Sequence, residues 1–402
     1  MDSAEREELR PKGNVPNLRF PEFQGEWEKC TLGNNVKIQG GYAFKSELFL
    51  RKGIPIIRIS NLPQNASFVD LDDCTYYKEG NYNSFEVHNG DLLIAMSGAT
   101  TGKTAIYNKK TLAYLNQRVG LFKSTNSDSL YYPFLYAFVS TPVFKRQLST
   151  RLIAGAQPNI SSSDIESIRI SIPQKTSEQE KIAHLMLLLD KRIATQNKII
   201  EDLKKLKSAI VEMEYSHMTK NISHIGDFIE QTSKRNKDSV IQNVLSVSNS
   251  QGFIQQSEQF ENRIVASDDT SNYKIVERND FAFNPARINV GSIARLITFE
   301  RGIVSPMYIC FRTKCNLFPE YLDYYFESKQ FFTEIQKRLE GSVRQCLSFD
   351  GLCNIPLCVP SVEIQRQIGK RLSTLVQEIK LEIDFLELLQ KQKKFLLYQM
   401  FI

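Results

Sequence analysis

Residues 97–104 have the composition of a phosphate-binding loop. They read Ser-Gly-Ala-Thr-Thr-Gly-Lys-Thr, with Lys103 beside the second glycine. The phosphate loop of nucleotide hydrolases needs four residues between its glycines, so that backbone amides ring the phosphates, and a helix must follow. Here three residues separate Gly98 from Gly102, and residues 105–107 have the pattern of a strand. We therefore predict a hairpin loop, whose small residues suit close approach to a phosphodiester backbone.

A second segment, Asn284-Pro285-Ala286-Arg287, is similar to the Asn-Pro-Pro-aromatic motif of amino-methyltransferases. It lacks the second proline and the aromatic residue that would stack on the base, and no convincing glycine-rich methyl-donor site precedes it. We predict a turn here. Its Arg287, with Asn284 and Asn289, still offers side chains that bind guanine and adenine edges in a bidentate manner.

Cysteine and histidine residues form no recognisable metal or catalytic set. Cys310 and Cys315 lack the second pair or the nearby histidines that zinc sites usually have. The four histidines show neither triad nor metal-ligand spacing; they are His88, His184, His217 and His224. Seven cysteines, an odd number in a chain that starts without an apolar leader, argue against a disulfide framework. We predict no metal site and no catalytic residues.

Polar and small residues gather instead in short segments between strand-like runs. Amide and arginine side chains are the usual readers of adenine and guanine, so these segments are candidate recognition loops. Each loop alone is equally well explained as a connector. In the N-terminal half the candidates are Gly41, Tyr42, Lys45, Asn61, Ser97, Thr100, Thr101, Lys103, Asn116, Gln117, Arg118, Gln157 and Asn159. In the C-terminal half they are Ser248, Asn249, Gln251, Asn284, Arg287, Asn289, Ser292, Tyr308, Ser342, Arg344 and Gln345.

The composition is that of a globular protein of two or three domains. Of 402 residues, 42% are hydrophobic and 24% charged, which is ordinary for a folded chain. No apolar run approaches the roughly 18–20 residues that span a bilayer. The charged N-terminus lacks the apolar region of a signal peptide. We therefore expect a cytoplasmic protein without a membrane partner.

Two segments have the pattern of unusually long helices. Residues 177–215 and 363–400 contain no proline, and residues 177–215 also contain no glycine. In both segments apolar residues recur at steps of three and four. In the first helix we predict a capping box at Ser177 and Glu180 and an apolar seam through Ile199, Leu206 and Met213. Each helix would be about 58 Å long at 1.5 Å per residue. A narrow apolar stripe needs a partner, and a coiled coil between the two helices is the simplest one. The alternative is that each helix packs on its own globular domain.

The segments before each helix form a tandem repeat. Strand-like runs at 54–59, 91–96 and 119–122 have counterparts at 244–247, 281–283, 293–297 and 307–311, and helical stretches follow at 133–148 and 319–339. Corresponding positions lie 186 to 189 residues apart throughout. Because order and spacing persist while most residues differ, we interpret the chain as two diverged copies of one unit, each ending in a long helix.

Several motifs together resemble the DNA-specificity subunit of type I restriction-modification systems, over nearly the whole chain. The order of two variable domains and two long helices is that family's layout. The second copy has Asn279-Asp280-Phe281-Ala282 in place of Gly-Asp-Leu-Leu, and no Gly-Ser loop is recognisable in it. The motifs that carry the resemblance are Leu18-Arg19-Phe20-Pro21-Glu22-Phe23 with Gly25-Glu26-Trp27-Glu28, Gly90-Asp91-Leu92-Leu93, Ser97-Gly98 with Gly102, and the helix entries Glu178-Gln179-x-Lys181-Ile182 and Gln365-x-Gln367-Ile368.

This resemblance implies an α+β fold and a function in DNA recognition. Residues 1–176 and 218–361 would be target-recognition domains, β-rich with helices, each binding one half of a split, asymmetric site in double-stranded DNA. Residues 177–217 and 362–402 would be spacer helices in an antiparallel coiled coil with approximate two-fold symmetry. The implied partners are two copies of a methylation subunit, which carries S-adenosylmethionine and methylates adenine N6, and two copies of a restriction or motor subunit, which uses ATP and magnesium. The chain itself would be non-catalytic and hold no cofactor.

The rival hypotheses are an enzyme that acts alone, either a DNA methyltransferase or a P-loop enzyme, and a coiled-coil scaffold that does not bind DNA. Turnover by the purified chain would indicate the first, and DNA binding that weakens steeply with salt would exclude the second. The net charge of +6 is small for a DNA-binding protein. It divides into +4 over residues 1–176, 0 over 177–215, 0 over 216–362 and +2 over 363–402. We therefore expect the isolated chain to bind DNA weakly and to become specific on assembly.

Overall fold

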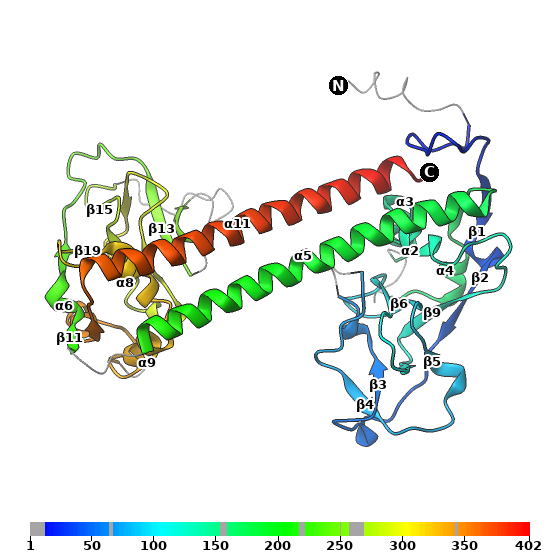
Figure 1. Ribbon diagram of the computed structural model, residues 1–402, viewed down its shortest axis with the longest axis horizontal. Helices are drawn as coiled ribbons and strands as arrows, with labels where there is room; N and C mark the ends of the chain where they lie inside the picture. The colour runs from blue at the N-terminus through cyan, green and yellow to red at the C-terminus, as the bar shows by residue number, and fades with distance from the viewer. Residues whose placement is uncertain are drawn as a thin grey trace. The chain divides into compact units, whose positions relative to one another are not determined.

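The computed structural model of the chain divides into two compact units (Figure 1). It describes residues 13–63, 67–152, 159–216, 222–249, 251–256, 269–341 and 345–402. Unit 1 is Met1–Ile199 with Ile383–Ile402, and unit 2 is Ile200–Glu382. Both boundaries fall inside the long helices α5 (Thr176–Ser216) and α11 (Val362–Gln399). Each unit therefore contains its own sheets and one half of each long helix.

Unit 1 is built on two four-stranded sheets and a two-stranded one. The sheet orders are β2-β9-β6-β7, β4-β3-β8-β5 and β1-β10, and the β3–β8 pair is parallel. The strands are β1 (Glu28–Thr31), β2 (Val36–Gly40), β3 (Ile54–Ile57), β4 (Thr75–Tyr77), β5 (Glu86–Val87), β6 (Leu92–Ala95), β7 (Thr104–Ile106), β8 (Ala113–Leu115), β9 (Val119–Ser124) and β10 (Arg169–Ile172). The short helices are α2 (Phe134–Phe138), α3 (Pro142–Leu152) and α4 (Ser162–Glu166).

Unit 2 repeats this topology. Its sheet orders are β12-β19-β16-β17, β14-β13-β18-β15 and β11-β20, and β13–β18 is again the parallel pair. The match, strand for strand, confirms the predicted tandem repeat. The strands are β11 (Ile222–His224), β12 (Ile229–Thr232), β13 (Val244–Ser248), β14 (Gly252–Gln255), β15 (Lys274–Glu277), β16 (Phe281–Phe283), β17 (Ile293–Arg295), β18 (Arg301–Val304), β19 (Ile309–Thr313) and β20 (Pro356–Cys358). The short helices are α6 (Ile225–Phe228), α8 (Pro319–Tyr325), α9 (Lys329–Gln336) and α10 (Phe349–Cys353).

The turn before β6 and β16 explains why the second copy has asparagine in place of glycine. Gly90 has a φ of +96° and Asn279 a φ of +71°, which is left-handed backbone in both units. Asparagine tolerates this conformation better than most residues with a side chain. The next residue is aspartate in both copies, and Asp91 and Asp280 each accept a hydrogen bond from the backbone N–H three residues earlier, at 2.7 and 2.9 Å. The two sequences therefore encode one turn.

Each long helix is fixed at its beginning by a buried glutamine. Gln179 and Gln365 are fully buried, and each side chain donates two hydrogen bonds to backbone carbonyls and accepts one from a backbone N–H. The partners are Ser129 O, Pro173 O and Tyr131 N for the first, and Asn316 O, Pro360 O and Phe318 N for the second. The capping box predicted at Ser177 is wrong, because α5 begins at Thr176 and Ser177 lies inside it.

The two long helices pair in an antiparallel manner within each unit. In unit 1, Asp190 forms an ion pair with Lys393, and Arg192 lies 5.1 Å from the centre of the Phe385 ring. In unit 2, Arg371 contacts a carboxylate of α5, Glu214, at 2.7 Å. The last residues of α11 join the core of unit 1, and its first residues join the core of unit 2. These pairings confirm the predicted association of the helices.

The predicted seam of α5 is wrong in part. Ile199, Leu206 and Met213 are exposed, whereas Gln196 and Ile200 are buried. The prediction avoided the polar Gln196 and so placed the stripe one residue early. Among the described residues, no helix has a stretch long and apolar enough to cross a bilayer.

Candidate nucleic-acid interface

The segment that resembles a phosphate loop is a hairpin between antiparallel strands. Ile94 in β6 pairs with Thr104 in β7, so a strand follows the loop where a phosphate loop needs a helix. Unit 2 has a loop at the same place, residues 284–292 between β16 and β17. Gly102 and Gly291 lie just before the second strand of their hairpins, with φ of +86° and +89°. The loop that was unrecognisable in the second sequence copy is therefore present, with its glycine at the equivalent position.

In unit 1 the segment after β2 lies against the loop between β8 and β9. The Tyr42 N–H donates to Leu115 O at 2.8 Å, and the Gln117 N–H donates to Tyr42 O at 2.9 Å. A Cβ atom at Gly41 would collide with the carbonyl oxygen of Asn116. Glycine at this position therefore allows the approach of two candidate loops that are more than 70 residues apart in the sequence.

The β6–β7 hairpin joins this group of loops. The Met96 N–H donates to Arg118 O at 2.9 Å, and the Ile160 N–H donates to Met96 O at 3.0 Å. Ser97 and Asn159 form an antiparallel bridge. Backbone hydrogen bonds thus collect segments 41–42, 96–103, 116–118 and 159–160 on one end of the unit 1 sheets.

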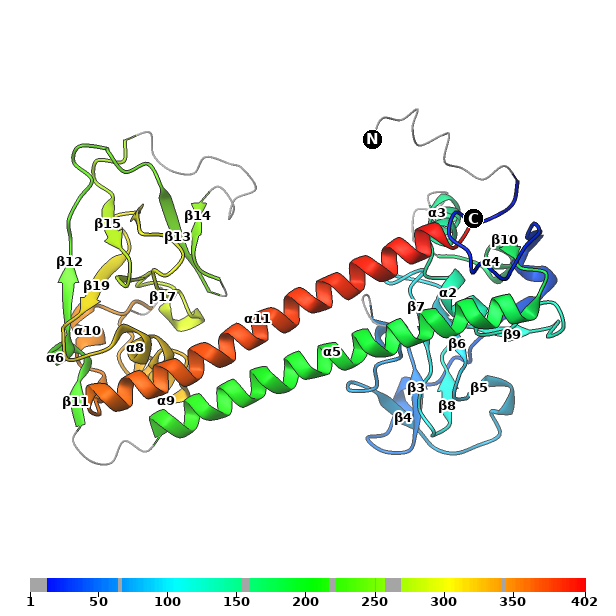
Figure 2. The ribbon, with the colours of Figure 1, turned by 45° about the horizontal axis from the view of Figure 1, so that its top comes forward.

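Unit 2 gathers the equivalent segments around Val247 near the end of β13. The Val247 N–H donates to the Tyr308 hydroxyl at 3.4 Å, and the Ser292 hydroxyl donates to Val247 O at 3.4 Å. The Leu347 N–H donates to Pro285 O at 3.1 Å, which brings in the segment from Gln345. Figure 2 shows β13, β14 and β17 together at this end of unit 2. Both units therefore bring together the loop between the sixth and seventh strands, the loop between the eighth and ninth strands, and the segment at 159–160 or 345–347.

Several predicted residues are buried and support the loops without reaching the surface. Asn61 accepts a hydrogen bond from Arg58 N and donates to Asp70 O, both at 2.9 Å. Asn284 accepts from Ala286 N at 3.1 Å, as expected for a turn. These side chains are occupied inside the fold, where they hold the loops in place. The buried candidates are Asn61, Asn284, Ser292 and Tyr308.

The remaining candidates divide by exposure. Those with exposed side chains are Tyr42, Lys45, Gln117, Arg118, Asn159, Asn249, Gln251, Arg287 and Gln345. Partly buried candidates are Gly41, Ser97, Thr100, Thr101, Lys103, Asn116, Ser248 and Asn289. The Ser97 and Thr100 hydroxyl oxygens are buried and have no hydrogen-bond partner among the described residues. Gln157, Ser342 and Arg344 lie outside the described residues.

A family model described as the type I restriction modification DNA specificity domain matches the chain twice, over residues 24–205 and 220–391. The two matches cover most of the chain and each contains one set of loops. The chain belongs to the type I restriction modification DNA specificity family. It carries two specificity domains, which correspond to the two copies of the repeat.

Several specificity subunits are also similar to this chain. The specificity subunit of the type I restriction enzyme MjaVIII from Methanocaldococcus jannaschii is 29% identical over 204 residues, which are 48% of this chain and 46% of that protein. That of EcoAI from Escherichia coli is 30% identical over 189 residues, 45% of this chain and 31% of that protein. The chain thus spans less than half the length of these curated relatives. The S subunit of a type I restriction-modification system from M. genitalium shares the fold, with a TM-score of 0.63 and 16% identity over 96% of this chain and 99% of that one.

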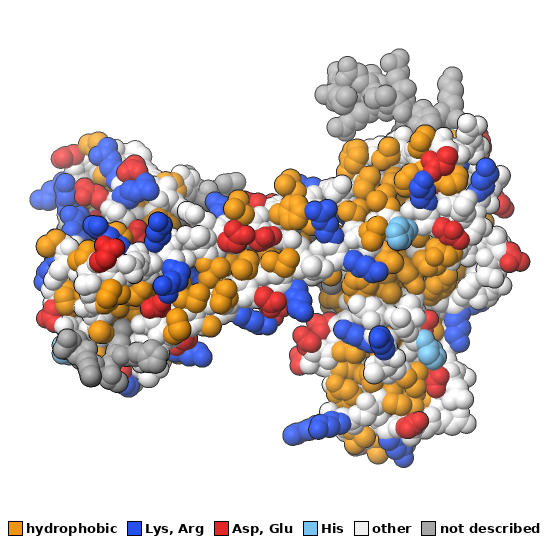
Figure 3. Space-filling model, viewed as in Figure 1, with side chains coloured by type: hydrophobic (Ala, Val, Ile, Leu, Met, Phe, Trp, Pro, Cys, Tyr) orange, Lys and Arg blue, Asp and Glu red, His pale blue; other side chains and the backbone are white. Residues whose placement is uncertain are grey.

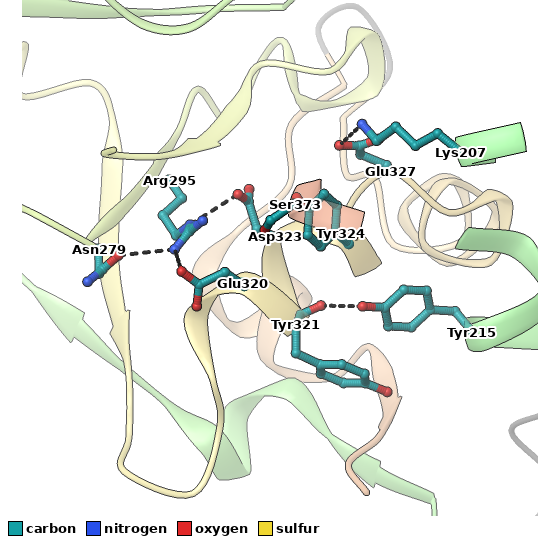
Figure 4. Close-up of polar contacts among 10 residues, drawn as sticks. All are labelled: Lys207, Tyr215, Asn279, Arg295, Glu320, Tyr321, Asp323, Tyr324, Glu327 and Ser373. Carbon is teal, nitrogen blue, oxygen red and sulfur yellow. Dashed lines mark hydrogen bonds and ion pairs between the residues drawn. The ribbon is translucent and has the colours of Figure 1, made fainter. Parts of the chain in front are cut away.

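The specificity domain of unit 2 is attached to its helices by polar contacts centred on the buried Arg295 (Figure 4). Arg295 on β17 donates to Glu320 and Asp323 on α8, at 2.7 and 3.1 Å, and to Asn279 before β16, at 3.1 Å. Burial raises the pKa of Asp323 to about 6, although Arg295 opposes the shift. Helix α8 and the turn that follows it are in turn bonded to the long helices. These contacts are Tyr324–Ser373 at 3.1 Å, Tyr215 to Tyr321 O at 2.6 Å and Lys207–Glu327 at 2.6 Å.

The described ranges of the specificity domains contain no assembled metal site, and two of their thiols are made less acidic by burial. No cluster of three or more histidine, cysteine, aspartate or glutamate residues within them is arranged to hold a metal ion. Burial raises the pKa of the Cys310 thiol to about 12 and that of Cys30 to about 11. Both thiols are therefore protonated at neutral pH and are poor nucleophiles.

Proposed function

We propose that each specificity domain binds one half of a split, asymmetric site in double-stranded DNA, and that the chain acts as a non-catalytic subunit. The observation that carries this proposal is the duplicated set of loops. The same strands deliver loops to the same end of each unit, but the exposed side chains on those loops differ. Two equivalent surfaces with different side chains suit two half-sites of different sequence.

The exposed loop residues have the chemistry of base readout. Gln117 and Asn159 in unit 1, and Asn249 and Gln251 in unit 2, carry amides that match the N6 and N7 edge of adenine. Arg118 and Arg287 are suited to guanine or to phosphate. In this proposal phosphate contacts orient each domain on the duplex, and the amides and arginines select the bases.

The long helices are proposed to separate the half-sites and to dock the partners. Two copies of a methylation subunit, which hold S-adenosylmethionine, would methylate adenine N6 within the site. Two copies of a restriction or motor subunit, with ATP and magnesium, would complete the nuclease. The proposal needs no cofactor on this chain. The small net charge supports a complex in which this chain selects the sequence and its partners make many of the phosphate contacts that give affinity for DNA.

Mapping methylated adenines in genomic DNA tests the proposal. The chain is co-expressed with the methylation subunit of its own system, and residues 218–361 are exchanged for those of a relative with a different site. We expect the exchange to change one half-site and leave the other half and the gap unchanged. The reciprocal exchange of residues 1–176 is the matched control and should change only the other half.

Two results would contradict the proposal. A change in both half-sites after one exchange would show that the units are not independent readers. Methyl transfer or nucleotide hydrolysis by the purified chain alone would favour the stand-alone methyltransferase or P-loop enzyme.

A further inference from the structure

Unit 1 holds one exposed tyrosine rigidly at the edge of an aromatic cluster. The Tyr42 ring centroid lies 5.0 Å from that of Phe44 and 5.3 Å from those of Tyr82 and Phe85. Phe44 is buried, whereas 41% of the Tyr42 surface is exposed. The Tyr42 backbone is hydrogen-bonded on both sides to the β8–β9 loop. This ring is therefore held in place beside the recognition loops, with a large apolar surface open to a ligand.

The sheet registers identify the equivalent position in unit 2. Strand β12 is the counterpart of β2, and β19 is the counterpart of β9. Both pairs are antiparallel, and residues of β9 and β19 correspond with the same offset along the whole strand. Counted through these partners, Tyr42 corresponds to Arg235, which lies just beyond β12. The β5–β8 and β15–β18 pairs show in the same way that Phe85 corresponds to Lys274. The aromatic pair of unit 1 is thus replaced by two cations in unit 2.

The two cations of unit 2 lie together and next to a recognition loop. Arg235 and Lys274 form an antiparallel bridge. The exposed Arg235 guanidinium donates to Asn272 Oδ1 at 3.0 Å, and Lys274 Nζ donates to Tyr308 O at 2.7 Å. No carboxylate among the described residues lies within ion-pair distance of either cation. Figure 3 shows lysine and arginine side chains, with aspartate and glutamate among them, over the part of unit 2 that contains β15 and β19.

We propose that this one position contacts the two half-sites by different chemistry. In unit 1, Tyr42 packs its ring on a base or sugar. In unit 2, Arg235, supported by Lys274, binds a DNA phosphate. The inference rests on the proposed function, because it assumes that the loop-bearing end of each unit faces DNA. Arg235 was not among the residues predicted from the sequence, since an exposed arginine after a strand carries no motif.

The two kinds of contact respond differently to salt. Each phosphate contact adds about 0.9 to the slope of log affinity against log salt, because a bound counterion is released. Loss of one contact therefore lowers affinity most at low salt and flattens the slope by about 0.9. Loss of an uncharged contact with one base pair of the duplex lowers affinity by roughly five- to a hundredfold and leaves the slope unchanged.

The test measures binding of the assembled complex to a duplex that contains its mapped site, between about 50 and 200 mM salt. Arg235→Gln should flatten the slope by about 0.9, whereas Arg278→Gln, an exposed arginine of the same unit that is paired with Glu300, should not. Tyr42→Ala should lower affinity roughly tenfold or more at every salt concentration, and Tyr42→Phe should retain it. Circular dichroism of each variant checks that the chain is folded, and Trp27 fluorescence adds a check on unit 1, which contains Tyr42.

Several results would overturn the inference. An unchanged slope of log affinity against log salt in Arg235→Gln would refute the phosphate contact. This would hold even if the variant bound with less selectivity at one base pair, because Arg235 would then contact a base. Equal losses in Tyr42→Ala and Tyr42→Phe would show that the hydroxyl, not the ring, makes the contact. Failure of the proposed function is distinguishable, since the unmodified complex would then bind its mapped site no better than unrelated DNA.

Discussion

The buried ion cluster of unit 2 gives a prediction with a defined magnitude. Arg295→Met removes the cation between Glu320 and Asp323 and keeps most of the side-chain volume. Removing one partner of a buried ion pair costs about 3–5 kcal/mol, because the other charge remains buried. The Arg295 side chain is 8% exposed, but those of Glu320 and Asp323 are 29% and 30% exposed. Solvent therefore screens part of the loss, and we expect roughly 2–3 kcal/mol.

The pH dependence of this loss has a definite sign. Asp323 has a pKa of about 6 in the folded chain against an ordinary value of 3.8. A carboxyl that binds its proton more tightly when folded makes stability fall as the pH rises from about 4 to about 6. Without Arg295 the pKa rises further, so the protonated carboxyl is favoured over a wider range. The penalty of Arg295→Met should therefore be larger near pH 8 than near pH 5.

Hydrogen exchange of β16, β17 and α8 measures the effect within unit 2. A loss of 2–3 kcal/mol corresponds to exchange roughly 30- to 150-fold faster. The control is Arg278→Met, whose exposed pair with Glu300 has side chains 55% and 79% exposed and should contribute at most about 1 kcal/mol. Trp27, the only tryptophan, lies in unit 1, so its emission should not change.

The reasoning fails if Arg295→Met is no more harmful than Arg278→Met, or if its penalty grows on acidification. Adding Asp323→Asn to Arg295→Met should recover much of the loss, because it removes the carboxylate left without a cation. A double variant as unstable as the single one would show that the loss comes from packing rather than from charge.

Three further predictions concern the helices. One extra heptad in each long helix adds about 10 Å and should lengthen the gap between the two half-sites by about three base pairs. The gap is measured by mapping methylated adenines, and an unchanged gap would contradict the spacer role. Gln179→Leu leaves three backbone groups without partners and should cost about 2–4 kcal/mol, against under about 0.5 for the exposed Gln367→Leu. Hydrogen exchange of the strands of each unit measures both losses. Asp190→Leu alone should destabilise the helix pair by about 3 kcal/mol, because Lys393 is left without its carboxylate, and adding Lys393→Leu should restore stability. Thermal unfolding measures both variants, and no recovery in the double variant would exclude an electrostatic origin.

The sequence was sufficient to predict the repeat, the long helices and several strands of each unit. These features depend on local periodicity and on spacing, which survive extensive substitution. Helix α5 starts one residue before its predicted start and ends one residue after its predicted end. The seam was harder to place, because Gln196 is buried between the helices, and a pattern of apolar residues alone excludes it.

The candidate interface could be predicted only as a set of loops. Residue type does not distinguish an asparagine that holds a turn from one that faces a ligand. The sequence therefore predicted Asn61 and Asn159 equally as DNA-binding residues. The structure separates them, since Asn61 is buried and Asn159 is exposed. Arg235 was missed because its significance comes from its partners across the sheet, which lie far away in the sequence.

Comparison of the two units separates residues that hold the backbone from residues that face outward. Gln179 and Gln365 make the same hydrogen bonds, as do Asp91 and Asp280, although the surrounding sequences have diverged. Tyr42, on the recognition side, has no such equivalent and is matched by a cation. Because the backbone contacts do not involve the outward side chains, one unit can change its surface without disturbing its own fold. Under the proposed function, the net charge of +4 in the first globular region and 0 in the second is a difference between the two surfaces that would bind the two half-sites. Total charge is a poor guide to such a chain, since the placement of single cations such as Arg235 matters more.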